Sequence, residues 1–193
     1  MDPKIKLHFK KMDPVLYRLL KLVGESKIVL SSKPSRQYFR ALCADIISQQ
    51  LSGKVADVFW TRFLKLFQPG QPSPDKLLAL PDSSLRKIGI SNSKTAYLKN
   101  LAEHVINKKI GLSKLSELSD EEVIKSLTIV KGIGCWTAEM FCMFSLGRPD
   151  MFSPGDQGLK NAIKKYYSQV PDPVIWSPYR TYACLILWKS LDL

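Results

Sequence analysis

Acidic residues are scarce in this chain. The 193 residues include 17 Asp and Glu against 29 Lys and Arg, which gives a formal net charge of +12. Such an excess favours a polyanionic partner, either a nucleic acid or an anionic membrane surface. The chain has no long apolar run and no basic amphipathic tail, which weakens the membrane interpretation. The basic residues are spread through the sequence, so they create a general field and no localised motif.

Cysteine and histidine patterns typical of metal sites are also missing. No two cysteines have Cys-x-x-Cys spacing, and neither histidine lies near a cysteine. This argues against zinc and iron–sulfur sites. Scattered cysteines without a disulfide framework suit a reducing, intracellular compartment. The lysine-rich start of the chain lacks the apolar region of a signal peptide, and no transit peptide is evident.

Alternation of polar and apolar residues, the signal of a strand, hardly appears, whereas helical periodicity recurs. One apolar stripe runs from Tyr38 to Ile47 and another from Val55 to Phe67. Ser73-Pro74 and Ser177-Pro178 each place an N-cap residue before proline, as at a helix start. No long-period repeat and no low-complexity run is present. We therefore predict an all-α protein whose helices are joined by short polar turns.

The segment from Val130 to Leu159 carries the strongest motif. Gly132 and Gly134 separate a helical pattern that ends at Val130 from one that begins at Cys135. A helix-Gly-x-Gly-helix hairpin presents backbone N–H groups that can bind phosphate, although glycines also serve simple turns between helices. Further on, Asp156 follows a Pro-Gly pair and precedes another helical pattern, where an N-cap would also be reasonable.

These elements resemble the helix-hairpin-helix (HhH-GPD) DNA glycosylases, and within them the alkylpurine (3-methyladenine) branch. Five elements match in the family's order, namely residues 46–52 (Ile-Ile-Ser-Gln-Gln-Leu-Ser), 85–98, the Gly-x-Gly-x-Trp-Thr-Ala element at 132–138, Asp156, and 176–183. The resemblance implies one glycosylase domain over 1–193, built from two helical subdomains with the active-site cleft between them. The central subdomain would cover about 36–150, and the two chain ends, about 1–35 and 151–193, would form the other.

The family's catalytic aspartate falls on Asp156. Purines such as 3-methyladenine and 7-methylguanine bear positive charge, so their glycosidic bond is already weak. Bond cleavage passes through an oxocarbenium-like sugar, and a single carboxylate can stabilise it or position the attacking water. We therefore expect Asp156 to be the catalytic residue.

The position after the hairpin predicts the reaction type. Bifunctional relatives carry a lysine nucleophile two residues after the second glycine, where this chain has Trp136. We therefore expect hydrolysis without lyase activity. By resemblance Trp136 is a pocket aromatic whose indole attracts a cationic base, the alternative being a core tryptophan. Trp188 matches a second pocket aromatic but equally suits a core position, and Tyr38 and Tyr179 could line the same cleft.

The family resemblance also predicts the contacts with DNA. By resemblance, the loop that carries Gln50 and Leu51 fills the gap left by a flipped base. We favour Gln50 by alignment with the family pattern, and Leu51 could instead be a helix-end apolar contact. Gly132 and Gly134 would allow close approach of phosphate. Three lysines are candidate phosphate contacts or solvated side chains, namely Lys131, Lys94 and Lys160. The hairpin carbonyls of Thr128, Val130 and Ile133 could hold Na⁺ or K⁺, and we expect no required cofactor and no iron–sulfur cluster.

The leading hypothesis is a monofunctional glycosylase that excises alkylated purines from double-stranded damaged DNA during base excision repair. We expect a monomer that is located with the DNA, in a bacterial cytoplasm or a nucleus, and that has no membrane partner. One alternative is a glycosylase for another damaged base, against which Trp136 and the missing cluster argue. The other is a non-catalytic protein that binds damaged DNA, against which Asp156 argues.

Overall fold

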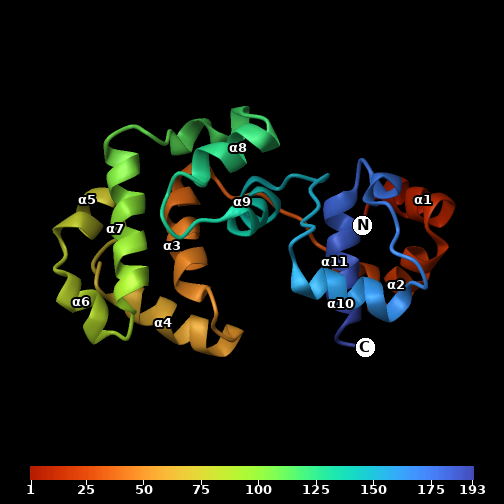
Figure 1. The fold of residues 1–193 in the computed structure, drawn as a ribbon, viewed down its shortest axis with the longest axis horizontal. Coiled ribbons are helices and arrows are strands. Elements are labelled where there is room, and N and C mark those ends of the chain that lie inside the picture. Colours follow the sequence, from red (N-terminus) through yellow and green to blue (C-terminus); the bar gives the residue numbers. More distant parts are fainter. The chain divides into compact units, whose positions relative to one another are not determined.

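The computed structural model describes all 193 residues and contains helices and turns without a β-strand, which confirms the predicted all-α class (Figure 1). No helix combines the length and apolar character needed to cross a membrane. The α-helices are α1 (Pro3–Met12), α2 (Pro14–Val23), α3 (Tyr38–Ser48), α4 (Gly53–Lys65), α5 (Pro74–Ala79), α6 (Asp82–Lys87), α7 (Asn92–Ile106), α8 (Asp120–Leu127), α9 (Cys135–Phe141), α10 (Gln157–Tyr166) and α11 (Arg180–Ser190). Short 3₁₀ helices are η1 (Glu25–Lys27), η2 (Ser35–Gln37), η3 (Leu112–Glu117) and η5 (Pro173–Trp176), and η4 (Cys142–Leu146) is π-helical.

The chain divides into two compact units. The central unit covers Lys33–Phe141, and the terminal unit combines Met1–Ser32 with Cys142–Leu193. The boundaries expected from the sequence, at 35/36 and 150/151, lie three and nine residues further along the chain. The second division follows α9 directly, where the helical backbone changes from α to π geometry.

The central unit is built around α3, which is apolar on most of its surface. Its buried side chains include Phe39, Leu42, Ile46 and Ile47, and α4, α7 and α9 pack against it. Burying side chains of this size contributes roughly 1.5–3 kcal/mol each relative to leaving them exposed. The helix α7 also packs along α5, so it connects both sides of this unit.

The terminal unit brings the two ends of the chain together. The helix α11 packs against α2 and α10, and α1 packs against α2 and η5 (Figure 1, red and blue ribbons). Asp13 caps α2 and is buried, where its Oδ2 accepts hydrogen bonds from Trp176 Nε1 at 2.7 Å and from the Tyr167 hydroxyl at 2.6 Å. Burial, together with this hydrogen bond to the carboxylate, raises the pKa of Tyr167 above its ordinary value. These bonds join α2 to residues more than 150 positions away.

Candidate active site

The helix α8, which leads into the hairpin, begins with a capping box. The Ser119 side chain accepts from the Glu122 N–H at 3.2 Å, and the Glu122 carboxylate accepts from the Ser119 N–H at 2.8 Å. The two glycines then differ in what they permit. Gly132 has a φ of +88°, and a β-carbon there would overlap the Tyr97 ring. Gly134 has no heavy atom within 4 Å of an added β-carbon. Packing therefore requires glycine at 132, whereas at 134 the protein itself leaves room for a side chain.

The loop after α3 carries the two predicted wedge candidates. Gln50 is exposed and has a φ of +60°, a left-handed conformation that costs of order 1 kcal/mol for a residue with a β-carbon. Strain of this kind is common at functional sites. Leu51 is half-buried and lines a small hollow with Ile47, Phe59 and Ile90. The apolar-contact alternative therefore suits Leu51, and Gln50 remains the predicted wedge.

The three lysines predicted to contact phosphate are not equivalent. The ammonium of Lys94 donates to the carbonyls of Ile47 at 2.8 Å and Gln49 at 2.6 Å, at the end of α3. Burial lowers the pKa of Lys94 from its ordinary value. These bonds hold the ammonium at the end of the loop, and a contact of Lys94 with phosphate stays a prediction. Lys131 and Lys160 are exposed, and their phosphate contacts remain predictions.

Trp136 is the second residue of α9, and its side chain is 45% exposed. A tryptophan that buries little more than half of its surface is no core residue, so the structure disfavours the core alternative. An exposed indole face next to the hairpin retains the ability to stack on a cationic base. Its role in a base pocket remains a prediction.

The two predicted pocket tyrosines have different surroundings. Tyr38 is only 4% exposed and packs edge-on against Phe141 at 5.3 Å between ring centroids. So little free surface makes Tyr38 a core residue of the central unit, which corrects the prediction of a pocket position. Tyr179 is half-buried and packs against His8 and Phe9 of α1, with ring centroids 5.3 and 6.5 Å away. These contacts join α1 to the start of α11.

Asp156 is the N-cap of α10 and is 8% exposed. Its Oδ1 accepts from the Leu159 N–H and from the Trp188 indole N–H, both at 2.8 Å. The capping role considered from the sequence is thus real, and it does not compete with catalysis because capping fixes the carboxylate in one orientation. Charge-assisted hydrogen bonds of this length are among the stronger ones in proteins.

Two residues that the sequence did not single out complete this arrangement. A β-carbon at Gly158 would lie 3.0 Å from Asp156 Oδ1 and 3.1 Å from Trp188 Nε1, so glycine allows their close approach. Phe144 of η4 packs against Trp188 with ring centroids 5.9 Å apart and is 37% exposed. Trp188 is therefore neither a plain core residue nor only a stacking surface, because its N–H holds the aspartate. A π-helical turn such as η4 is frequent at functional sites.

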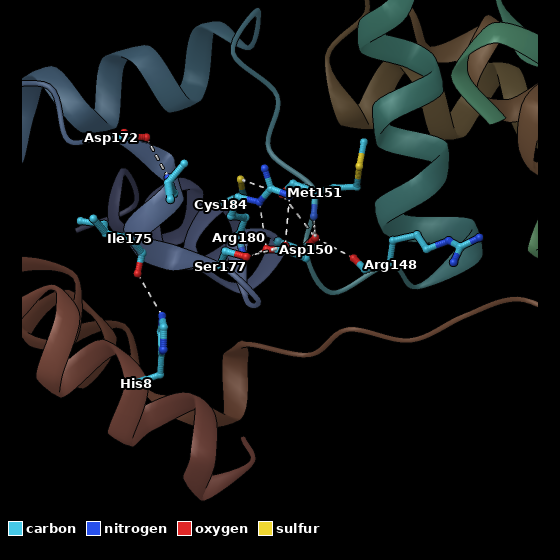
Figure 2. Close-up of polar contacts among 11 residues, drawn as sticks. His8, Arg148, Asp150, Met151, Asp172, Ile175, Ser177, Arg180 and Cys184 are labelled. Atoms are coloured by element: carbon cyan, nitrogen blue, oxygen red, sulfur yellow. Dashed lines mark hydrogen bonds and ion pairs between the residues drawn. The ribbon is translucent and has the colours of Figure 1, made fainter. Parts of the chain in front are cut away.

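The carboxylate of Asp150 anchors the start of α11 (Figure 2). Its carboxylate accepts from the Ser177 hydroxyl at 2.8 Å and from the Arg180 guanidinium at 2.9 and 3.1 Å. Burial tends to raise the pKa of Asp150, but the hydrogen bonds from Arg180 and Ser177 outweigh it and hold the pKa below its ordinary value. Figure 2 also shows His8 of α1, whose Nε2 lies 3.0 Å from the Ile175 carbonyl oxygen.

The candidate cation ligands lie in the turn between α8 and α9. The Val130 carbonyl accepts the Ile133 N–H at 3.0 Å, and the Thr128 hydroxyl donates to the Ile124 carbonyl at 2.8 Å. Binding of Na⁺ or K⁺ by the carbonyls of Thr128, Val130 and Ile133 remains a prediction. Elsewhere, no group of three or more His, Cys, Asp or Glu side chains is arranged to hold a metal ion.

Comparisons with known proteins show the family to which the chain belongs. The model of the HhH-GPD superfamily of base excision DNA repair proteins matches residues 43–173. DNA-3-methyladenine glycosylase 1 of Schizosaccharomyces pombe is 33% identical over 201 residues, which cover 98% of this chain and 88% of the relative.

Two solved structures are also similar. The crystal structure of a DNA-3-methyladenine glycosidase from Bacillus halodurans has a TM-score of 0.83 and 36% identity, covering 97% of this chain and 88% of the other. The Schizosaccharomyces pombe 3-methyladenine DNA glycosylase in complex with abasic DNA has a TM-score of 0.87 and 32% identity, covering 98% and 97%. The five sequence elements, the hairpin and the family match agree, and the chain belongs to the HhH-GPD superfamily of base excision DNA repair proteins.

Proposed function

We propose that this protein is a monofunctional DNA glycosylase that hydrolyses the N-glycosidic bond of alkylated purines such as 3-methyladenine and 7-methylguanine. The observation that carries the proposal is the held carboxylate of Asp156, which two N–H donors at 2.8 Å fix in one orientation. The similar proteins named as 3-methyladenine glycosylases support the substrate class.

The proposed reaction needs few groups. The C1′–N bond breaks heterolytically, and the bonding electron pair leaves with the base, which thereby becomes neutral. The sugar is left as an oxocarbenium-like cation, which the Asp156 carboxylate stabilises electrostatically. Water adds to C1′ and loses a proton, which gives an abasic site. The residue two positions after Gly134 is Trp136, so no amine at that position can form a Schiff base with the sugar.

The remaining predicted residues have binding roles in this proposal. The N–H groups around Gly134 and the side chains of Lys131 and Lys160 contact phosphate. Gln50 fills the gap in the duplex, and Trp136 offers an indole face to the cationic base, an attraction of roughly 0.5–2 kcal/mol.

The protein binds DNA, and we propose that its substrate is double-stranded damaged DNA. We propose that it acts as a monomer and is located with the DNA, in a bacterial cytoplasm or a nucleus. We propose further that no metal or organic cofactor is required, with Na⁺ or K⁺ at the hairpin carbonyls having a structural role. Excision at full rate in EDTA is the expected result, and a loss restored by a divalent metal would contradict this part.

The direct test is incubation of dimethyl sulfate-treated duplex DNA with the purified protein, followed by chromatography of the released bases. Free 3-methyladenine and 7-methylguanine should accumulate with wild type and not with Asp156→Asn. If both proteins bind the DNA but neither releases a base, the chain is a damage-binding protein and no enzyme. Release of oxidised bases alone would move it to another branch of the family.

A further inference from the structure

The loop after α3 and the hairpin are tied to each other. The Gln49 side-chain amide donates to the Gly132 carbonyl at 2.8 Å and to the Thr137 hydroxyl at 3.3 Å. Gln49 directly precedes Gln50, which has the left-handed φ of +60°. The residue directly before the predicted wedge is therefore hydrogen-bonded to both sides of the hairpin turn.

A single face of α7 supports both elements. Lys94, Tyr97 and Asn100 are spaced three residues apart, so they project from one side of the helix. Lys94 donates to the carbonyls of Ile47 and Gln49 at the loop end, and Asn100 Oδ1 accepts the Lys131 N–H at 2.9 Å at the hairpin end.

Between these two contacts, the Tyr97 ring packs on Gly132 so closely that no β-carbon fits there. The loop, the middle of the hairpin and its start are thus each held by a different residue of one rigid helix.

We propose that this face of α7, together with the Gln49 side chain, is a brace that makes the loop 48–52 and the hairpin 128–134 one rigid DNA-facing surface, with Lys94 and Gln49 as positioning residues. Displacing a base costs a few kcal/mol, and phosphate contacts supply binding energy without base information. If the loop and the hairpin are rigidly connected, the free energy of phosphate binding at the hairpin also favours insertion of the wedge into the duplex. If the connection is flexible, the hairpin can bind phosphate while the loop stays outside the base stack.

The role of the brace in base displacement rests on the proposed function. Its effect on the rigidity of the loop and the hairpin does not, because that effect can be measured in the free protein. The test variant is Lys94→Met, which keeps the length of the side chain and removes the ammonium. The chain offers a matched control in Lys99, also on α7, whose ammonium donates to the Leu78 carbonyl at 3.0 Å and to the Leu80 carbonyl at the end of α5. Lys99→Met removes the same kind of carbonyl contact, together with a long ion pair to Asp82 at 3.8 Å, from a helix end that has no predicted role with DNA.

The first measurement is amide hydrogen exchange of the free proteins. In Lys94→Met, exchange at residues 48–52 and 131–134 should rise at least tenfold, while Lys99→Met should leave both segments unchanged. Gln49→Met, which removes the direct bonds from the loop to the hairpin, should give the same pattern, and Lys94→Arg should restore protection. Unchanged exchange in a folded Lys94→Met or Gln49→Met protein would overturn the brace.

The second measurement separates positioning from phosphate binding. Affinity for duplex DNA with a tetrahydrofuran abasic analogue should keep its salt slope in Lys94→Met, because this ammonium bonds to the Ile47 and Gln49 carbonyls. Base displacement, reported by 2-aminopurine fluorescence at the target position, should fall about tenfold more than affinity does. A slope smaller by about 0.9 would make Lys94 a direct phosphate contact and overturn the proposal. Neither measurement needs excision, so failure of the brace and failure of the glycosylase assignment are distinguishable.

Discussion

Replacing Asp156 with asparagine should remove the charge of the candidate catalytic group and little else. Asparagine keeps an oxygen that can accept the Leu159 and Trp188 N–H groups, which now lie 2.8 Å from the carboxylate. The cap of α10 and the position of the indole should therefore survive. This makes the variant a charge deletion in an otherwise unchanged fold.

The size of the effect follows from electrostatics. A unit charge about 4 Å from a developing cation interacts by about 4 kcal/mol at an effective dielectric constant near 20. With 1.36 kcal/mol for each factor of ten, excision should slow by about three orders of magnitude. DNA affinity should stay equal or rise, because one negative charge facing a polyanion is lost.

The assay is single-turnover release of 7-methylguanine from duplex DNA, with enzyme in excess so that product release does not mask the chemical step. Asp156→Ala is the companion variant, because it also removes the N-cap acceptor, which costs about 0.5–2 kcal/mol of stability. Both variants should lose activity alike, and only the alanine variant should lower the free energy of unfolding appreciably. Excision by a folded Asp156→Asn protein within tenfold of wild type would refute the catalytic role.

Three further predictions concern the reaction, the hairpin and stability. Because position 136 holds tryptophan, borohydride should trap no covalent complex with DNA and the product should be an intact abasic site; efficient trapping would mean that another amine acts as nucleophile. Gly134→Ala should fold normally yet weaken binding to abasic and undamaged DNA in similar proportion, whereas Gly132→Ala should lower the melting temperature. Unchanged DNA affinity in Gly134→Ala would mean that the hairpin is only a turn between helices. Asp150→Asn should cost about 1–2 kcal/mol of unfolding free energy at neutral pH through weaker bonds to the partly exposed Arg180. Since the pKa of Asp150 is depressed, this contribution is present above the ordinary carboxyl pKa and lost as the pH falls through the folded-state value, so denaturant titrations of the two proteins should converge in acid.

The sequence by itself determined the features that depend on near neighbours along the chain. Helical periodicity, the Ser119–Glu122 capping box and the cap at Asp156 are local, since each pairs residues within three or four positions, and the structure contains them all. The charge of +12 and the order of the family elements also needed no coordinates, and together they indicated DNA and the glycosylase family.

Only the tertiary structure decided which partner each polar side chain has, because spacing along a chain says nothing of contacts made across it. Lys94 had the signature of a phosphate contact, yet it reaches carbonyls more than 40 residues away. From the sequence, Trp188 suited a core position and a pocket position equally well. The structure shows that its indole N–H donates a hydrogen bond to Asp156, 32 positions earlier. Tyr38 differed from an accessible aromatic only by its burial against Phe141. In each case the free energy of a long-range contact overrides what the local pattern can specify, and that contact exists only once the helices have packed.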